Sequence, residues 1–308
     1  MADIPVQILK VARPIHWIKN LALFAALFFT SNFFEASLVK TVLLAFISFS
    51  FAASAAYVFN DIVDAEKDKR HPVKKYRPIA SGKLSKKIAL IEVFVLLGLS
   101  FIFSINLNIL FHLTLIFYVV LQALYSMFLK NITTIDILTI AFGFVIRIYA
   151  GAFVINAHLS VWFLLCVIST ALFLAAGKRR SELNIPESAS GITRASLSKY
   201  SKELLNSYVT MFGNASWLSW SLFAFYESPR ASLDVWLLLA EISKTTTVDK
   251  LLMASIPVVI YTIMRYESLI FEGKSEAPEK IILSDKGLIT SVLIWLMMVY
   301  WVYYVAVV

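Results

Sequence analysis

The sequence of 308 residues has little of what thiol or imidazole chemistry requires. Its one cysteine, Cys166, lies in an apolar stretch, cannot form an intrachain disulfide and indicates neither a disulfide framework nor a cysteine metal site. The histidines show no metal-ligand spacing, and we interpret all of them as loop or interfacial residues: His16, His71, His112 and His158. The chemistry of this chain must therefore be sought in other side chains.

Other features are missing as well. The first apolar stretch is long and has no small-residue cleavage site before a polar chain, so we do not expect a cleavable signal peptide. We find no repeat period, low-complexity tract or separate soluble domain. The sequence therefore predicts one helical-bundle domain over residues 1–308.

Apolar residues, in contrast, are abundant and come in long blocks. The mean hydropathy is +0.78 and 59% of residues are hydrophobic, whereas about half are apolar in ordinary soluble domains. A bilayer span needs about 20 mainly apolar residues. Nine blocks qualify: 16–34, 38–59, 88–105, 109–129, 134–155, 159–177, 205–226, 251–268 and 288–308. We predict an all-α polytopic membrane protein with nine transmembrane helices.

The net charge of +8 is distributed unevenly along the chain. If the N-terminus is inside, 23 of the 28 Lys and Arg residues fall on the cytoplasmic side, as the positive-inside rule requires. This distribution predicts a multi-pass protein of the plasma (inner) membrane and removes the need for a nucleic-acid partner. The long cytoplasmic connections 60–87, 178–204 and 269–287 hold most of the charge, so we expect the functional site on that face.

Three carboxylates follow the second apolar block in the segment "NDIVDAEKD". Asp61, Asp64 and Asp68 are spaced i, i+3, i+7, so a helix that continues past Asn60 places them on one face. Like charges so close together favour a bound divalent cation, and oxygen ligands suit Mg²⁺, which typically uses one or two carboxylates plus substrate phosphates. The alternative is a solvated helix end whose acids pair with neighbouring cations such as Lys67.

The cations that follow, in "HPVKKYRPIASG", are candidates for holding phosphate oxygens. Arginine offers a planar fork and lysine a point charge. We assign this role to Lys74 and Arg77, whereas for the lysines at 83–87 we favour topology determination and attraction to anionic lipids.

Further candidates lie near the cytoplasmic ends of other blocks. Lys19, in "RPIHWIKN" with Arg13, is either a phosphate contact or an interfacial anchor. Tyr125 and Lys130 end the fourth block about one turn apart. Arg147 lies within the fifth block, and an ionisable side chain at that depth normally faces the bundle interior or a wet cavity. Its role is either substrate binding or structural.

The segment "GKRRSELN" ends the sixth block with three adjacent cations and an acid. Cations in sequence spread around a helix, so at most two face a cavity, and we expect these to be Lys178 and Arg179. Glu182 is the one carboxylate in the segment. Together, one acidic and three basic patches describe a pocket for a Mg²⁺-bound polyanion that opens into a hydrocarbon-lined interior, which favours a lipid as second substrate.

The motif "NDIVDAEKD" resembles the N-D-x-x-D-x-x-x-D motif of the UbiA superfamily of intramembrane prenyltransferases. The typical aromatic prenyltransferases carry a second aspartate-rich motif at the end of the sixth helix, where this chain has "GKRRSEL". Together with "YSMFLK", "IRIYAGA" and "RYESLIFEGKSEAPEKIILSD", this departure resembles the decaprenyl-phosphate phosphoribosyltransferase branch, over nearly the whole chain.

The resemblance implies transfer of 5-phosphoribose from 5-phosphoribosyl-1-diphosphate (PRPP) to a polyprenyl (decaprenyl) phosphate, with Mg²⁺ as cofactor and diphosphate as product. The candidate metal ligands are Asp61, Asp64 and Asp68, and the candidate catalytic residues are Asp61, Asp64 and Lys178. The candidate substrate-binding residues are Lys19, Asn60, Lys74, Arg77, Tyr125, Lys130, Arg147, Lys178, Arg179 and Glu182.

Two rival functions fit less of the sequence. A prenyltransferase that joins a polyprenyl diphosphate to an aromatic or haem acceptor would want a second carboxylate cluster near 177–184, where only Glu182 is available. A transporter for anionic solutes explains the apolar blocks and the basic face but not the aspartates. Lipid chain length, the downstream pathway (cell-wall arabinan or another glycan) and the oligomeric state, a homo-oligomer included, stay open.

Overall fold

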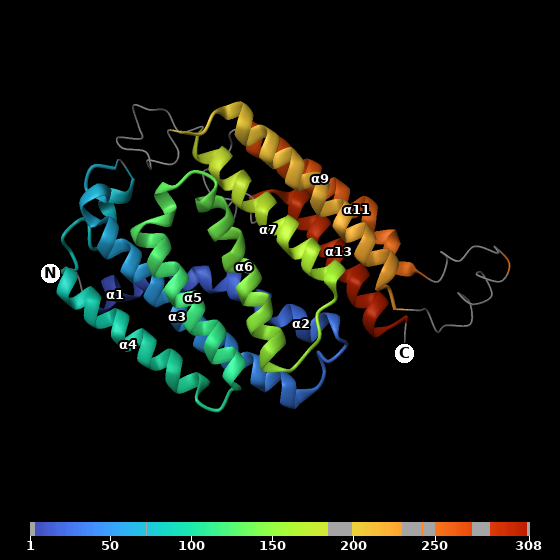
Figure 1. Cartoon of the computed structure of the whole chain (residues 1–308), viewed down its shortest axis with the longest axis horizontal. Helices are drawn as coiled ribbons and strands as arrows, with labels where there is room; N and C mark the ends of the chain where they lie inside the picture. The colour runs from blue at the N-terminus through green and yellow to red at the C-terminus, as the bar shows by residue number, and fades with distance from the viewer. Residues whose placement is uncertain are drawn as a thin grey trace. The chain divides into compact units, whose positions relative to one another are not determined.

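The computed structural model describes residues 4–71, 73–183, 199–229, 242, 250–272 and 284–306. Within these residues all regular structure is helical and no strand occurs, as predicted. The chain divides into two compact units (Figure 1): residues 1–158 with 185–200, and residues 159–184 with 201–308. The single domain over residues 1–308 stays a prediction.

The first unit is built around one very long helix. Its elements are α1 (Ile4–Ala12), η1 (Pro14–Leu23), α2 (Phe24–Phe29), α3 (Ala36–Asp68), η2 (Lys74–Tyr76), α4 (Lys86–Ser104), α5 (Ile109–Met127), η3 (Leu129–Asn131) and α6 (Ile135–Val154), where η denotes a 3₁₀-helix. Helix α3 packs against α4, α5, α6 and η1. It has 33 residues and continues without a break through the predicted acidic motif.

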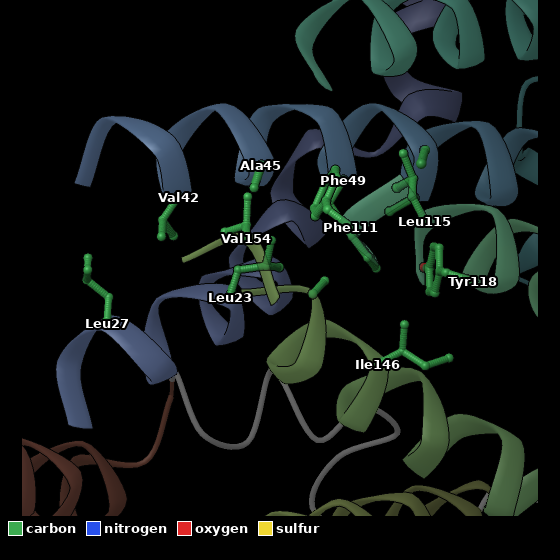
Figure 2. Packing of buried hydrophobic residues seen from close by; sticks show 13 residues of the cluster. Leu23, Leu27, Val42, Ala45, Phe49, Phe111, Leu115, Tyr118, Ile146 and Val154 are labelled. Atoms are coloured by element: carbon green, nitrogen blue, oxygen red, sulfur yellow. The ribbon is translucent and has the colours of Figure 1, made fainter. Parts of the chain in front are cut away.

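Small side chains allow neighbouring helices to approach α3 closely. Its buried positions include Ala45, Ser48, Ala52 and Ala55, and small residues are the usual means of close helix packing where lipid surrounds a bundle. Leu23, Phe49, Phe111 and other residues from η1, α2, α3, α5 and α6 form the main apolar cluster beside them (Figure 2). The cluster holds these elements together along the part of α3 that precedes its polar C-terminal end.

Five helix starts follow local capping rules. Ser85, Asn108, Ser160, Ser201 and Asp285 each accept a hydrogen bond from a backbone N–H of the first turn of the helix that follows. Side chains of this kind are the preferred N-caps because they satisfy an otherwise orphan donor. These starts could be derived from sequence alone.

Helix α6 begins differently. Its cap residue Thr134 has φ 71°, an unusual value for a residue with a side chain, and makes no side-chain cap. Its backbone N–H donates instead to the hydroxyl of Tyr200 (2.6 Å), which donates in turn to Oδ1 of the fully buried Asp136 (2.8 Å). A residue 66 positions away in sequence therefore caps α6.

The second unit consists of α7 (Val161–Glu182), α9 (Lys202–Tyr226), η5 (Leu251–Ser255), α11 (Ile256–Phe271) and α13 (Lys286–Tyr304). Helices α7 and α9 pack along each other, and α11 contacts α7, α9 and α13. A core cluster centred on Phe173, Val209 and Ile270 joins them.

Seven helical segments in the described part of the chain are long and apolar enough to cross a membrane: Ala36–Asp68, Lys86–Ser104, Ile109–Met127, Ile135–Val154, Val161–Glu182, Leu251–Phe271 and Lys286–Tyr304. The predicted span 16–34 is divided between η1 and α2, and the predicted span 205–226 forms α9, which is rich in serine and asparagine. The membrane character is thus confirmed, whereas the count of nine helices stays a prediction.

Candidate active site

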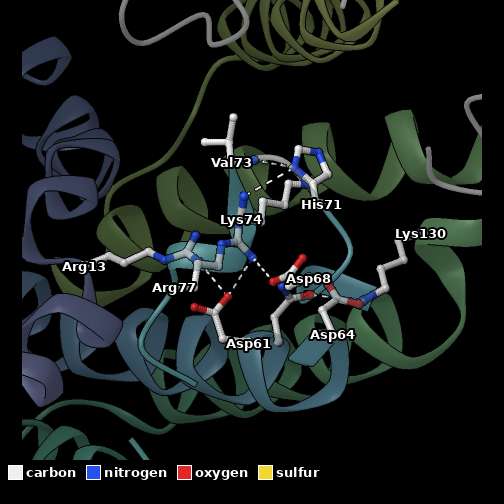
Figure 3. Close-up of polar contacts among 10 residues, drawn as sticks. Arg13, Asp61, Asp64, Asp68, His71, Val73, Lys74, Arg77 and Lys130 are labelled. Carbon is white, nitrogen blue, oxygen red and sulfur yellow. Dashed lines mark hydrogen bonds and ion pairs between the residues drawn. The ribbon is translucent and has the colours of Figure 1, made fainter. Parts of the chain in front are cut away.

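The three aspartates project from one face of the last turns of α3 (Figure 3), as their spacing predicted. Asp61 and Asp68 are buried, with 3% and 5% of their surface exposed. Buried carboxylates are costly unless paired. Each of the three forms an ion pair with a cation from elsewhere in the chain.

Arg77 links two of these carboxylates. Its Nη1 lies 3.0 Å from Oδ1 of Asp61 and 2.7 Å from Oδ2 of Asp68. The chain returns to α3 because the backbone N–H groups of Val73 and Lys74 donate to Nδ1 of His71, which turns the segment after the helix (Figure 3). A short loop thus brings Arg77 onto the helix that precedes it.

Arg13 is the second partner of Asp61, with Nη2 2.5 Å from Oδ1. Arg13 was not among the predicted site residues, although it lies in the segment "RPIHWIKN" with the candidate Lys19. Arg13 lies at the junction of α1 and η1 with φ 51° and ψ 58°, a left-handed conformation that breaks the helix there. Pro14 signals that a helix ends at Arg13, because a proline disfavours the right-handed α region at the preceding residue, but no local pattern signals the left-handed conformation.

Lys130 serves the third carboxylate. Its side chain is 4% exposed, and Nζ donates to Oδ1 of Asp64 (2.6 Å) and to Oδ1 of Asn60 (3.3 Å). Lys130 lies in η3, between α5 and α6, so α3 and the α5–α6 connection meet at this pair. The prediction grouped Asn60, Asp64 and Lys130 in one site, and the structure brings them into contact.

The partners of the aspartates are therefore cations from outside α3, between 9 and 66 positions away in sequence, and the aspartates do not pair with Lys67 as the alternative proposed. The neighbouring surface shows the contrast, since Glu66 pairs with Lys69 and Lys86 in exposed positions. Exposed pairs of that kind contribute little to stability, whereas the pairs of Asp61, Asp64 and Asp68 concentrate charge of both signs in one shielded place.

Three further predicted residues lie in the same unit. Lys19 on η1, Lys74 on η2 and Tyr125 on α5 are all half-buried. That they contact substrate stays a prediction.

Arg147 occupies the interior of the first unit, with 5% of its surface exposed. Its guanidinium donates to Oδ1 of Asn20 (2.7 Å), to the carbonyl of Gly143 (2.5 Å) and to the hydroxyl of Tyr118 (2.9 Å). All three partners are uncharged, and no carboxylate pairs with Arg147 among the residues that the structure describes. These contacts favour the structural alternative over substrate binding.

The remaining predicted residues belong to the second unit. Lys178, Arg179 and Glu182 lie in the last turns of α7. Arg179 is fully buried and its Nη1 pairs with Oε2 of Glu182 at 2.7 Å, while Nε of Arg180 donates to Oδ1 of Asn206 (2.5 Å). The substrate-binding role of Lys178, Arg179 and Glu182 stays a prediction.

Comparison with known proteins assigns the family. The profile of the UbiA prenyltransferase family matches residues 21–179. The chain belongs to the UbiA prenyltransferase family. It is 34% identical to the decaprenyl-phosphate phosphoribosyltransferase of Mycolicibacterium smegmatis, over 94% of this chain and 90% of that protein. It is 31% identical to the enzyme of the same name from Mycobacterium tuberculosis, over 96% of this chain and 93% of that one.

Solved UbiA structures share the fold. A UbiA homolog from Archaeoglobus fulgidus bound to GPP and Mg²⁺ superposes with a TM-score of 0.65 at 17% identity, over 98% of this chain and 99% of that chain. A second solved chain, of a digeranylgeranylglyceryl phosphate synthase, gives a TM-score of 0.63 at 18% identity, over 97% and 98% of the two chains. Identity this low supports the UbiA fold alone.

The carboxylates of this UbiA chain suit a divalent metal that is shared with substrate. Each ion pair uses one oxygen: Oδ1 of Asp61, Oδ1 of Asp64 and Oδ2 of Asp68. The second oxygen of each makes no hydrogen bond within the described part of the chain. Among the described residues no three acidic, His or Cys groups stand close enough to hold a metal by themselves. Such a site fits Mg²⁺, which takes few carboxylates and completes its shell with phosphate oxygens and water.

Proposed function

We propose that this UbiA-family protein transfers 5-phosphoribose from PRPP to a polyprenyl phosphate such as decaprenyl phosphate, releasing diphosphate. The observation that carries the proposal is the cluster of three aspartates held by Arg13, Arg77 and Lys130 at the end of α3. The names of relatives aligned over more than nine tenths of the chain support it.

The cluster has the charge pattern that the donor requires. PRPP carries a diphosphate and a separate 5-phosphate, so it needs a metal-loaded acidic site and additional cations. In the free protein the three cations neutralise the three carboxylates. An arriving donor offers the same cations phosphate oxygens, and charge-assisted bonds of this kind are among the strongest in proteins. Arg77 and Lys130 are thus placed to bind phosphates where the carboxylates bind metal.

The reaction needs no general base. The acceptor phosphate is already anionic, and its oxygen attacks C1 of the ribose as the bond from C1 to the diphosphate oxygen breaks. The electron pair of that bond leaves with the diphosphate. The work of the protein is therefore to position two substrates and to balance charge. Asn60, which accepts a hydrogen bond from Lys130, and Tyr125 are proposed to orient the donor.

Asp61 and Asp64, aided by Asp68, are the residues that would hold the metal. Bound there, Mg²⁺ supplies positive charge that stabilises the departing diphosphate. Asp64 is the most accessible of the three aspartates, with 14% of its side chain exposed, and it pairs with one lysine only. Within the described residues Asp68 also pairs with one cation and Asp61 pairs with two, so Asp64 is the aspartate that combines a single ion pair with the greatest access.

An assay on membranes tests the proposal. With radiolabelled PRPP and polyprenyl phosphate we expect label in the lipid extract, dependent on Mg²⁺ and abolished by EDTA. Incorporation only from a labelled polyprenyl diphosphate into an aromatic or haem acceptor would overturn the proposal in favour of the rival prenyltransferase.

A variant probes the metal ligand directly. Asp64→Asn keeps the size of the side chain and removes its charge, so turnover should fall about 100-fold or more, while the protein still folds. Glu66→Gln, an exposed carboxylate on the same helix, serves as the matched control. Wild-type turnover in Asp64→Asn would refute the metal site.

A further inference from the structure

Residue Arg147 is connected through one side chain to α3, the helix that carries the aspartate cluster. Asn20, which is fully buried, accepts the hydrogen bond from Nε of Arg147 and donates through Nδ2 to Oγ of Ser50 (3.0 Å). Arg147 belongs to α6, Ser50 to α3 and Asn20 to η1. The amide of Asn20 therefore ties η1 to both helices.

A second contact between α6 and η1 lies one turn further along α6. A Cβ atom added to Gly151 would lie 1.9 Å from the carbonyl oxygen of Leu23, so the two backbones touch. Residues 147 and 151 are four apart and share one face of the helix. This face of α6 holds η1 at two points, by polar contact at Asn20 and by close backbone packing at Leu23.

Element η1 depends on such contacts. It is a ten-residue 3₁₀-helix, and 3₁₀-helices longer than three or four residues are uncommon because their hydrogen bonds are poorly aligned. Its side chains bond to α3 in antiparallel order: Arg13 to Asp61, Trp17 to Ser54 (2.9 Å) and Asn20 to Ser50. A shift of η1 along α3 would therefore move Arg13 away from Asp61.

We propose that Arg147 is a positioning residue, which sets the place of η1 through Asn20 and thereby holds Arg13 on Asp61. The buried guanidinium has the geometry for this role, since it bonds Asn20, Gly143 and Tyr118 at once and stands 4.9 Å from the ring of Tyr118. A lysine cannot replace it, because one ammonium nitrogen cannot reach three partners in a fork.

Hydrogen–deuterium exchange tests the structural half of this inference independently of the proposed function. In Arg147→Lys the backbone amides of residues 15–23 should exchange about tenfold faster than in the wild type, while those of α4 do not change. Tyr149→Phe, on the same helix, is the matched control and should leave both segments unchanged. Unchanged exchange at residues 15–23 in Arg147→Lys would overturn the inference.

Kinetics test the functional half, which rests on the proposed function. Arg147→Lys should raise KM for PRPP about tenfold, and this effect should vanish in an Arg13→Gln background, because both changes remove the same interaction. If the increases in KM of the two single variants multiply in the double variant, Arg147 acts independently of Arg13, and the proposal is refuted. Absence of any phosphoribosyl transfer in the wild type would refute the proposed function alone, and the exchange experiment would still decide the role of Arg147.

Two further variants guard against a folding defect. Should Arg147→Lys fail to fold, Asn20→Ala removes only the linking amide, and faster exchange at residues 15–23 is again expected. Gly151→Ala pushes η1 away from α6 by steric contact and should give the same exchange pattern. If the amides of residues 15–23 exchange as slowly in Asn20→Ala as in the wild type, the inference is contradicted.

Discussion

Arg77 carries more of the aspartate cluster than any other single cation, because it bonds both Asp61 and Asp68 through one nitrogen. The carboxylates of Asp61 and Asp68 are buried, whereas the side chain of Arg77 is 26% exposed. An incoming phosphate can therefore reach the guanidinium without first opening the protein. At the scale of single residues, this exposure distinguishes Arg77 from Arg147, which is 5% exposed and bonds only uncharged partners in the described part of the chain.

Arg77→Gln should raise KM for PRPP about 10- to 100-fold, since it removes a charge-assisted contact with a phosphate. Steady-state kinetics on membranes that contain the variant measure this KM. Arg70→Gln removes an exposed cation of the same segment and should have no effect. Equal effects of the two changes would show that the segment acts only through its overall charge.

The three aspartates were predictable because a 3.6-residue period places them on one face wherever a helix forms. The contact of Arg13 was not predictable, because it depends on the left-handed conformation of Arg13, which interrupts the helix between α1 and η1. Arg147 illustrates a third case. Its burial was predictable from its place in an apolar block, but its three uncharged partners come from separate parts of the sequence.

At the scale of elements, the start of α6 shows how a distant side chain replaces a local cap. Tyr200→Phe removes the hydroxyl that accepts from Thr134 and donates to Asp136. We expect a loss of about 1 to 2 kcal/mol in the free energy of unfolding. Burial raises the pKa of Tyr200, so its hydroxyl stays protonated and remains a donor around neutral pH. The loss of stability in Tyr200→Phe should therefore not depend on pH in that range.

Unfolding in detergent measures this loss, and Tyr76→Phe, at a site 72% exposed, is the matched control. An unchanged stability of Tyr200→Phe would mean that Thr134 keeps its backbone conformation unaided.

The start of α13 has a measurable pH dependence. Asp285 caps this helix and pairs with Arg265 at 2.7 Å, and the hydrogen bond from Arg265, followed by the one from the Leu288 backbone, lowers the pKa of Asp285 to about 2. A lowered carboxylate pKa stabilises the protein above the unfolded pKa, near 4, and this contribution is lost as the pH falls towards 2.

Asp285→Asn keeps the cap and removes the charge. The wild type should therefore be more stable than this variant at pH 7, and the difference in melting temperature should shrink between about pH 4 and pH 2. Comparing the two proteins cancels the titration of other carboxylates. A difference that is constant across this range would exclude the ion pair as its source.

The first apolar block marks the limit of hydropathy as a guide to elements, because it changes from a 3₁₀-helix to an α-helix at Phe24 and leaves the helix after Phe29. Residues 16–34 are apolar enough to span a membrane, yet the structure divides them between η1 and α2. Hydropathy measures how unfavourably a segment is exposed to water. It does not indicate which backbone hydrogen-bond pattern the segment adopts. The contacts of Asn20 and Gly151 that hold η1 come from other elements and cannot be derived from the block itself.

At the scale of the whole molecule, the charge distribution predicts which face meets the cytoplasm. With Cys166→Ser as background, Lys75→Cys should react with a membrane-impermeant maleimide only after cells are permeabilised, whereas Glu35→Cys should react in intact cells. Both positions are exposed in the structure. The reverse pattern would place the aspartate cluster outside and require the donor to be exported.

The length of α3 has a consequence for where the two proposed substrates meet. At 1.5 Å per residue, its 33 residues extend about 50 Å, while the hydrocarbon core is about 30 Å thick. The excess corresponds to roughly a dozen residues, which is about the stretch from Asn60 onward together with the preceding turn. The predicted apolar block ends at residue 59, so we expect the carboxylates to lie outside the hydrocarbon core, at the level of the lipid phosphate groups. A water-soluble sugar phosphate and a lipid anchored by its tail can both arrive at that height, and the diphosphate can return to water without crossing any barrier.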